Sequence, residues 1–129
     1  MLEANRIVLA DLKTQIRGTV DRASVVEGAV EIGPGATVER SRLRGPLVVG
    51  AGAKIADAYV GPFTAIGDHV QLSHCEIEHS IVLERSRISD IHGRIESSLI
   101  GKDAVVCASG SRPRTHRLML GDSSRVELA

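Results

Sequence analysis

The chain has 129 residues, 43% of them hydrophobic, which is enough material for one domain with a packed core. Its 16 Lys and Arg residues balance its 16 Asp and Glu residues, so no net charge draws it toward nucleic acid or an anionic membrane. With one Tyr, one Phe and no Trp, it also has few aromatic surfaces on which bases or sugar rings could stack.

Residues 1–17 are expected to form a linker helix that caps the domain. Apolar residues recur in this segment at helical spacing, at Leu2, Leu9, Leu12 and Ile16. The segment is too charged and too short for a signal peptide or a membrane span, and two cysteines make no disulfide framework. These features favour a cytoplasmic protein without a membrane partner.

Residues 18–111 carry a repeat with a period of 17 residues. An aliphatic residue, usually followed by Gly, recurs at Ile32, Val49, Ile66 and Ile100, and Leu83 fills the remaining position of this grid. Two further aliphatic columns are Val26, Leu43, Val60 and Ile77, and Val38, Ile55 and Leu72. Within one period the aliphatic residues are spaced six, six and five apart, which fits neither an amphipathic helix nor a β-hairpin.

The repeat is built from six-residue phrases such as "IGPGAT" and "VGAGAK". In each phrase the aliphatic residue and a small residue can point inward, while Gly and Pro supply a corner. Three phrases then close one triangular coil, and the strands of successive coils stack in parallel at about 4.8 Å. Small residues at Ser41, Ala58 and Cys75 form one more inward column. The sequence therefore predicts an all-β parallel solenoid of about five coils.

The spacing becomes irregular after Leu83. Leu83 to Ile88 is five residues, Ile88 to Ile95 is seven, and Ile95 to Ile100 is five. The period is preserved overall, so a local bulge or a short external loop near "SDIHGR" is expected to leave the stacking in register. After the last coil, residues 112–129 are expected to form a capping segment, in which "RLML" and "RVEL" make a closing strand pair.

The two cysteines and a basic cluster near the C-terminus are not expected to form functional sites. Cys75 and Cys107 are expected on one face about 10 Å apart, which is too far for a disulfide. They also lack a paired His at zinc-ligand spacing, so no metal site is predicted. The basic cluster Arg112, Arg114 and Arg117 is interpreted as a solvated loop, with contact to the phosphate of an effector as the alternative.

Several runs, including "VGPFTAIGDHV", "EIEHSIVLE", "RIESSLIGK" and "LMLGDSSRVEL", resemble the C-terminal hexapeptide-repeat domain of long-form glucose-1-phosphate thymidylyltransferases. The resemblance covers nearly the whole chain. It implies a left-handed parallel β-helix, against the usual right-handed crossover. In that family, nucleotidyl transfer with Mg²⁺ belongs to a separate N-terminal domain, whose Gly-rich nucleotide loop this sequence does not contain.

The resemblance implies an oligomerisation or regulatory domain, either excised or a stand-alone paralogue. The parent would convert dTTP and glucose 1-phosphate to dTDP-glucose and pyrophosphate. The chain itself is expected to be non-catalytic, to need no cofactor, and to bind no nucleic acid. Its flat prism faces and outward small or apolar residues, including Ala56, Ala65 and Val82, favour a homotrimer, with a dimer through the N-terminal helices as the runner-up.

The competing hypothesis is a hexapeptide-repeat acyltransferase that uses acetyl-coenzyme A on a sugar phosphate, with a His as general base. The candidate residues are His74 and His79, and His69 and His92 are the other histidines of the repeat region. His74 and His79 are expected on two different faces of the solenoid, which argues against a shared dyad or metal. We therefore predict no catalytic residue in this chain.

Overall fold

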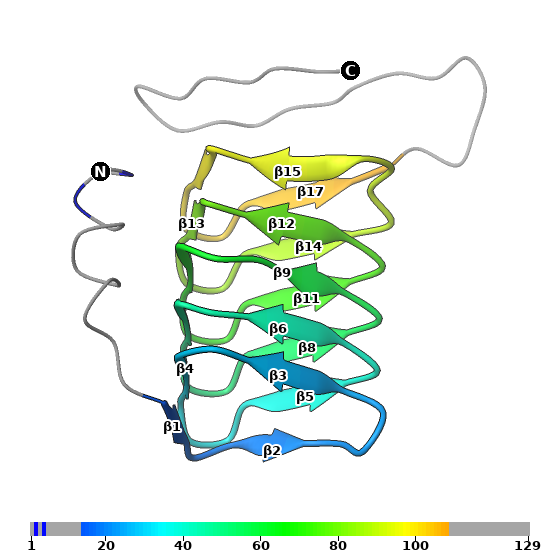
Figure 1. Cartoon of the computed structure of the whole chain (residues 1–129). Coiled ribbons are helices and arrows are strands. Elements are labelled where there is room, and N and C mark those ends of the chain that lie inside the picture. The colour runs from blue at the N-terminus through cyan, green and yellow to red at the C-terminus, as the bar shows by residue number, and fades with distance from the viewer. Residues whose placement is uncertain (1, 3, 5–13, 109–129) are drawn as a thin grey trace.

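In the computed structural model, residues 2, 4 and 14–108 are described, and residues 14–108 form a parallel β-solenoid of about five coils (Figure 1). The strands are β1 Gln15–Ile16, β2 Thr19–Val20, β3 Val25–Glu27, β4 Val30–Ile32, β5 Thr37–Glu39, β6 Arg42–Arg44, β7 Leu47–Val49, β8 Lys54–Ala56, β9 Tyr59–Val60, β10 Thr64–Ile66, β11 Gln71–Ser73, β12 Glu76–Glu78, β13 Ile81–Val82, β14 Arg87–Ser89, β15 Arg94–Glu96, β16 Leu99–Ile100 and β17 Val105–Cys107. The predicted all-β architecture and coil number are confirmed.

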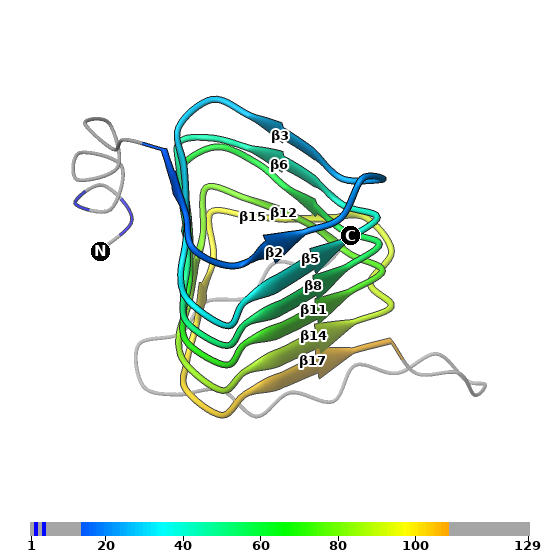
Figure 2. The same cartoon turned by 90° about the horizontal axis from the view of Figure 1, so that it is seen from below.

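Every third strand belongs to the same sheet. Sheet A has the order β1-β4-β7-β10-β13-β16, sheet B is β2-β5-β8-β11-β14-β17, and sheet C is β3-β6-β9-β12-β15. Figure 2 looks along the triangular solenoid from its N-terminal end. The chain passes from sheet A through sheet B to sheet C in a counter-clockwise sense while it moves away from the viewer. The solenoid is therefore left-handed.

The core consists of the aliphatic columns that the sequence predicted. Val38 pairs with Ile55, Ile55 with Leu72, and Leu43 with Val60, and all of these side chains are buried. The strand residues on either side of each buried aliphatic face outward. Small inward residues at Ser41, Ala58 and Cys75 are also buried, as expected.

The prediction for Leu83 is wrong by one residue. Ile66 pairs with Val82, which is 1% exposed and belongs to the core, whereas Leu83 is half-buried in the following turn. The cause is a phrase of five residues from Ile77 to Val82, where the preceding coil has six from Val60 to Ile66. Leu83 thus occupies the corner position that Gly67 occupies one coil earlier.

Of the two alternatives predicted near "SDIHGR", the structure shows the short loop, because the extra residues lie between two strands. Four residues, 90–93, connect β14 to β15, where two residues, 74–75, connect β11 to β12 in the preceding coil. Gly93 takes a φ of 83°, a left-handed conformation that Gly adopts without steric cost. β15 still pairs in parallel with β12, so the insertion leaves the stacking intact.

Buried serines connect neighbouring coils. Ser80 Oγ donates to the Glu78 carbonyl at 2.8 Å and accepts a hydrogen bond from the Ser98 N–H at 3.1 Å. Ser41 Oγ likewise donates to the Glu39 carbonyl at 2.7 Å and accepts a hydrogen bond from the Ala58 N–H of the next coil at 3.2 Å. Each hydroxyl satisfies backbone groups that the corners would otherwise leave without a partner.

Replacing Thr64 with Val is expected to raise the free energy of unfolding by about 1 kcal/mol. Thr64 is fully buried in β10 of sheet A, one coil before Ser80, which directly precedes β13, but its Oγ1 has no hydrogen-bond partner among the described residues, so its desolvation is not compensated. Urea unfolding monitored by circular dichroism measures the change. Ser80→Ala is the matched control and should lower stability, because it removes two hydrogen bonds. Equal losses in both variants would contradict the prediction.

The predicted terminal caps fall mostly outside the described residues. Leu2 and Ala4 have helical backbone, but Ile16 does not continue a helix. Instead, Gln15 and Ile16 form β1 and pair with Glu31 and Ile32. The helix predicted over residues 1–17 is therefore wrong at its C-terminal end, because this part of the chain already supplies a strand to sheet A. The capping segment predicted at 112–129 lies outside the described residues.

Candidate functional site

The histidines of the central coil lie at three different corners of the solenoid. His69 follows β10, His74 follows β11 and His79 follows β12, and their φ angles are 57°, 49° and 47°. Each therefore occupies the left-handed turn position of its corner. The sequence predicted that His74 and His79 lie on different faces, and the structure keeps them apart. His92 is exposed in the insertion between β14 and β15.

His74 belongs to a row of charged side chains along the corner between sheets B and C. Arg40 makes a bidentate pair with Asp57, with Nε–Oδ1 at 2.9 Å and Nη2–Oδ2 at 3.1 Å. His74 Nε2 lies 3.9 Å from Asp57 Oδ2, the oxygen that also accepts the Arg40 Nη2 hydrogen bond, and the His74 side chain is 62% exposed. Asp21 accepts a hydrogen bond from the Arg40 N–H at 3.1 Å. Asp57 is thus engaged mainly by Arg40, and the row links successive coils.

The hydrogen bonds from Arg40 hold the pKa of Asp57 below its usual 3.8. A depressed folded-state pKa means that the ionised carboxylate stabilises the fold above pH 3.8, and that this contribution is lost as the pH falls through the lower folded-state pKa. We therefore expect the urea midpoint to fall on acidification below about pH 4, and to fall less in the Asp57→Asn variant. Urea titrations at several pH values make the comparison. An unchanged pH dependence in Asp57→Asn would contradict it.

The two cysteines do not lie in one column, which corrects the expected placement. Cys75 is buried at the corner after β11, and desolvation raises the pKa of its thiol to about 11. Cys107 pairs with Ser89 on the outer face of sheet B and is exposed. Both thiols are free. Cys107 follows the inward Val106, so the strand alternation turns it outward.

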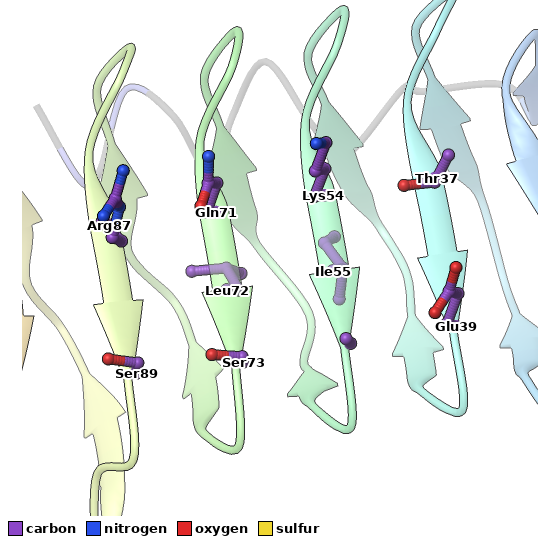
Figure 3. Close-up of a pocket in the computed structure, with 10 residues that line it drawn as sticks. Thr37, Glu39, Lys54, Ile55, Gln71, Leu72, Ser73, Arg87 and Ser89 are labelled. Atoms are coloured by element: carbon purple, nitrogen blue, oxygen red, sulfur yellow. The ribbon is translucent and has the colours of Figure 1, made fainter.

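A groove runs along the outer face of sheet B (Figure 3). Arg87, Gln71, Lys54 and Thr37 form one edge, and Ser89, Ser73 and Glu39 lie along the other edge, with Leu72 and Ile55 between them. The register places the residues of each edge on adjacent strands. The concavity has a volume of about 390 Å³. Sequence reasoning missed these residues, although those of the first edge share one signal: each directly precedes a buried aliphatic residue of the same column.

The outer face of sheet A carries an apolar stripe. Val48, Ala65, Ile81 and Leu99 lie on adjacent strands in one outward column. Ile81 is 8% exposed and Leu99 38%. The predicted outward position of Val82 is wrong, because the five-residue phrase turns Val82 inward and places Ile81 on the surface column; Ala56 and Ala65 are outward and half-exposed as expected.

Three kinds of feature remain: the basic cluster, metal-binding groups and membrane-spanning helices. Arg112, Arg114 and Arg117 lie outside the described residues. Within the described part of the chain, no three His, Cys, Asp or Glu side chains gather in a group that could hold a metal ion. A helix long and apolar enough to cross a membrane is not found among the described residues either.

The chain is similar in sequence to three larger nucleotidyltransferases. It is 49% identical over 128 residues to a glucose-1-phosphate thymidylyltransferase of Streptomyces antibioticus and 42% identical over 129 residues to one of Streptomyces griseus. It is 39% identical over 131 residues to the low-salt glycan biosynthesis nucleotidyltransferase Agl11 of Haloferax volcanii. These matches cover 99%, 100% and 99% of this chain, and 36% of each relative.

No family model matches the chain. A solved hexapeptide transferase family protein of Anaplasma phagocytophilum is 21% identical, with a TM-score of 0.27 over 83% of this chain and 81% of that protein. The sequence relatives are more informative, because they match from one end of the chain to the other. The chain is similar along its whole length to the C-terminal portion of glucose-1-phosphate thymidylyltransferases, and it spans 36% of the length of the relatives it matches.

Proposed function

We propose that this β-helix is the C-terminal oligomerisation and regulatory domain of a cytoplasmic glucose-1-phosphate thymidylyltransferase. The observation that carries the proposal is the match of the full chain to 36% of proteins with that name. Nucleotidyl transfer from dTTP to glucose 1-phosphate, which yields dTDP-glucose for dTDP-sugar synthesis, would then take place with Mg²⁺ in a separate nucleotidyltransferase domain. The acyltransferase alternative gains no support from the sequence relatives, and its candidate bases His74 and His79 lie at separate corners, where they form no dyad.

The proposed role is to hold copies of the parent enzyme together, most simply as a homotrimer. Three triangular prisms can close around an axis through one repeated heterologous contact, which leaves no free surface of that kind. The apolar stripe on sheet A supports this arrangement, because Leu99, which is 38% exposed, and the half-buried Val48 and Ala65 gain free energy when they are covered. The runner-up is a dimer through the N-terminal segments.

Light scattering on the purified chain tests the assembly. The expected mass is three times the 13.7 kDa of one chain, and Leu99→Asp should lower it by disrupting the stripe. Val105→Asp is the matched control, because Val105 is 63% exposed on sheet B, and it should leave the mass unchanged. A mass of 13.7 kDa for the unmodified chain would reject self-association, and twice that value would favour the dimer.

An activity assay tests whether nucleotidyl transfer requires a domain other than this chain. With dTTP, glucose 1-phosphate and Mg²⁺, the 129-residue chain alone is expected to release no pyrophosphate above the protein-free control. Robust turnover would show that this chain contains the nucleotidyltransferase site, and the proposal would fail. Release of free coenzyme A from acetyl-coenzyme A in the presence of an amino-sugar phosphate would instead favour the acyltransferase.

A further inference from the structure

The groove on sheet B is lined by polar side chains that the fold does not use. These side chains make no hydrogen bond or ion pair with another described residue, whereas most charged side chains among the described residues do. They are Thr37, Lys54, Gln71, Ser73, Arg87 and Ser89. On sheet C, by comparison, Arg42 pairs with Glu27 at 3.3 Å and Arg94 pairs with Glu76 at 3.2 Å. The donors of sheet B therefore remain available to a ligand.

The register fixes how these donors are arranged. Lys54, Gln71 and Arg87 stand on three adjacent strands in one outward column. Strand spacing places the Lys54 and Arg87 backbones about 10 Å apart, with Gln71 midway, and both long side chains can reach a point above Gln71. Figure 3 shows the three side chains along the same edge of the groove. An anion above Gln71 would meet two cations and an amide donor.

The opposite edge offers hydroxyl groups at short side chains. Ser73 and Ser89 follow Gln71 and Arg87 two residues later on the same strands, which is about 7 Å across the groove. Glu39 lies at the far end of this edge of the groove. Its carboxylate is 3.7 Å from the Arg40 guanidinium, which offsets its negative charge. The small residues leave room for a body larger than a single anion, within a volume of about 390 Å³ that is ordinary for small-molecule sites.

We propose that this groove binds the phosphate monoester of a polyhydroxylated small molecule, a sugar phosphate in chemical class. Lys54, Gln71 and Arg87 donate to the phosphoryl oxygens, where hydrogen bonds from charged donors are strongest. Ser73 and Ser89 exchange hydrogen bonds with the hydroxyls of the body. Because the site is on the solenoid itself, the inference does not depend on the activity proposed for the parent enzyme.

Calorimetric titration of the 129-residue chain with glucose 1-phosphate, inorganic phosphate and glucose tests this site. Saturable binding of glucose 1-phosphate in the millimolar range or tighter is expected, with weaker binding of phosphate and none of glucose. Lys54→Gln and Arg87→Gln should each weaken binding of both anions about tenfold. Ser73→Val should weaken the binding of glucose 1-phosphate and leave the affinity for inorganic phosphate unchanged.

Arg44→Gln is the matched control, because Arg44 is an exposed arginine of sheet C without an ion-pair partner among the described residues, and it should not alter binding. The thermal midpoints of all variants should agree, since each altered side chain points outward. Three results would overturn the proposal: no saturable binding up to about 10 mM ligand, an equal loss in Arg44→Gln, or unchanged affinity in Lys54→Gln and Arg87→Gln.

Discussion

Val82→Asp is expected to abolish the cooperative folding of the solenoid, whereas Leu83→Asp should leave it folded. Val82 is 1% exposed and stacks between Ile66 and Ile100, so Asp there would bury a carboxylate without a partner. An uncompensated buried charge costs about 3–5 kcal/mol, which is a large part of the stability of a domain of this size. Leu83 is half-buried in a turn, and a carboxylate there can reach water.

Thermal melts followed by circular dichroism compare the two variants. Ile66→Asp belongs to the same column and should behave like Val82→Asp, because Ile66 is 2% exposed. The two substitutions at 82 and 83 are matched in chemistry and adjacent in sequence, so only the register distinguishes them. Unfolding of Leu83→Asp with a native-like Val82→Asp would restore the register with Leu83 in the core.

The sequence was sufficient to predict the coil because its aliphatic columns are dictated by one steric requirement. A buried position in every phrase must be filled by Val, Ile or Leu, and the corners need residues that turn easily. The register of the fourth coil was not predictable in this way. Ile66 and Val82 are 16 residues apart and Val82 and Ile100 are 18 apart, so the two coils together have the same length as two periods of 17. Since Val82 and Leu83 are both apolar, the sequence did not show which of the two occupies the core position.

The groove was harder to predict than the core, because its character depends on what its side chains do not contact. Lys54 and Arg87 look like ordinary surface cations in the sequence, as do Arg42 and Arg94. Only the structure distinguishes the last two, which pair with Glu27 and Glu76 on neighbouring strands. Ile16 was misassigned for a related reason, since its helical spacing to earlier leucines was overridden by pairing with Ile32.

Cys75 is expected to resist thiol reagents in the folded protein, while Cys107 reacts at once. Only the thiolate is nucleophilic, and burial raises the pKa of Cys75 to about 11, so about one molecule in a thousand is ionised near pH 8. The side chain is also 4% exposed, which blocks access by a bulky disulfide reagent. Cys107 is exposed on sheet B. A colorimetric thiol assay at about pH 8 should therefore count one fast thiol per chain, and two after unfolding in denaturant.

Two variants assign the fast thiol. Cys107→Ser should remove the fast phase, and Cys75→Ala should retain it without loss of the fold, because Ala58 fills the same inward position one coil earlier. The raised pKa also has a consequence for stability. The folded state favours the protonated thiol, so its contribution is intact below pH 9.0 and is lost as the pH rises toward 11. Fast reaction of both cysteines in the native protein would contradict the burial of Cys75, and with it the inward column that Ser41 and Ala58 share.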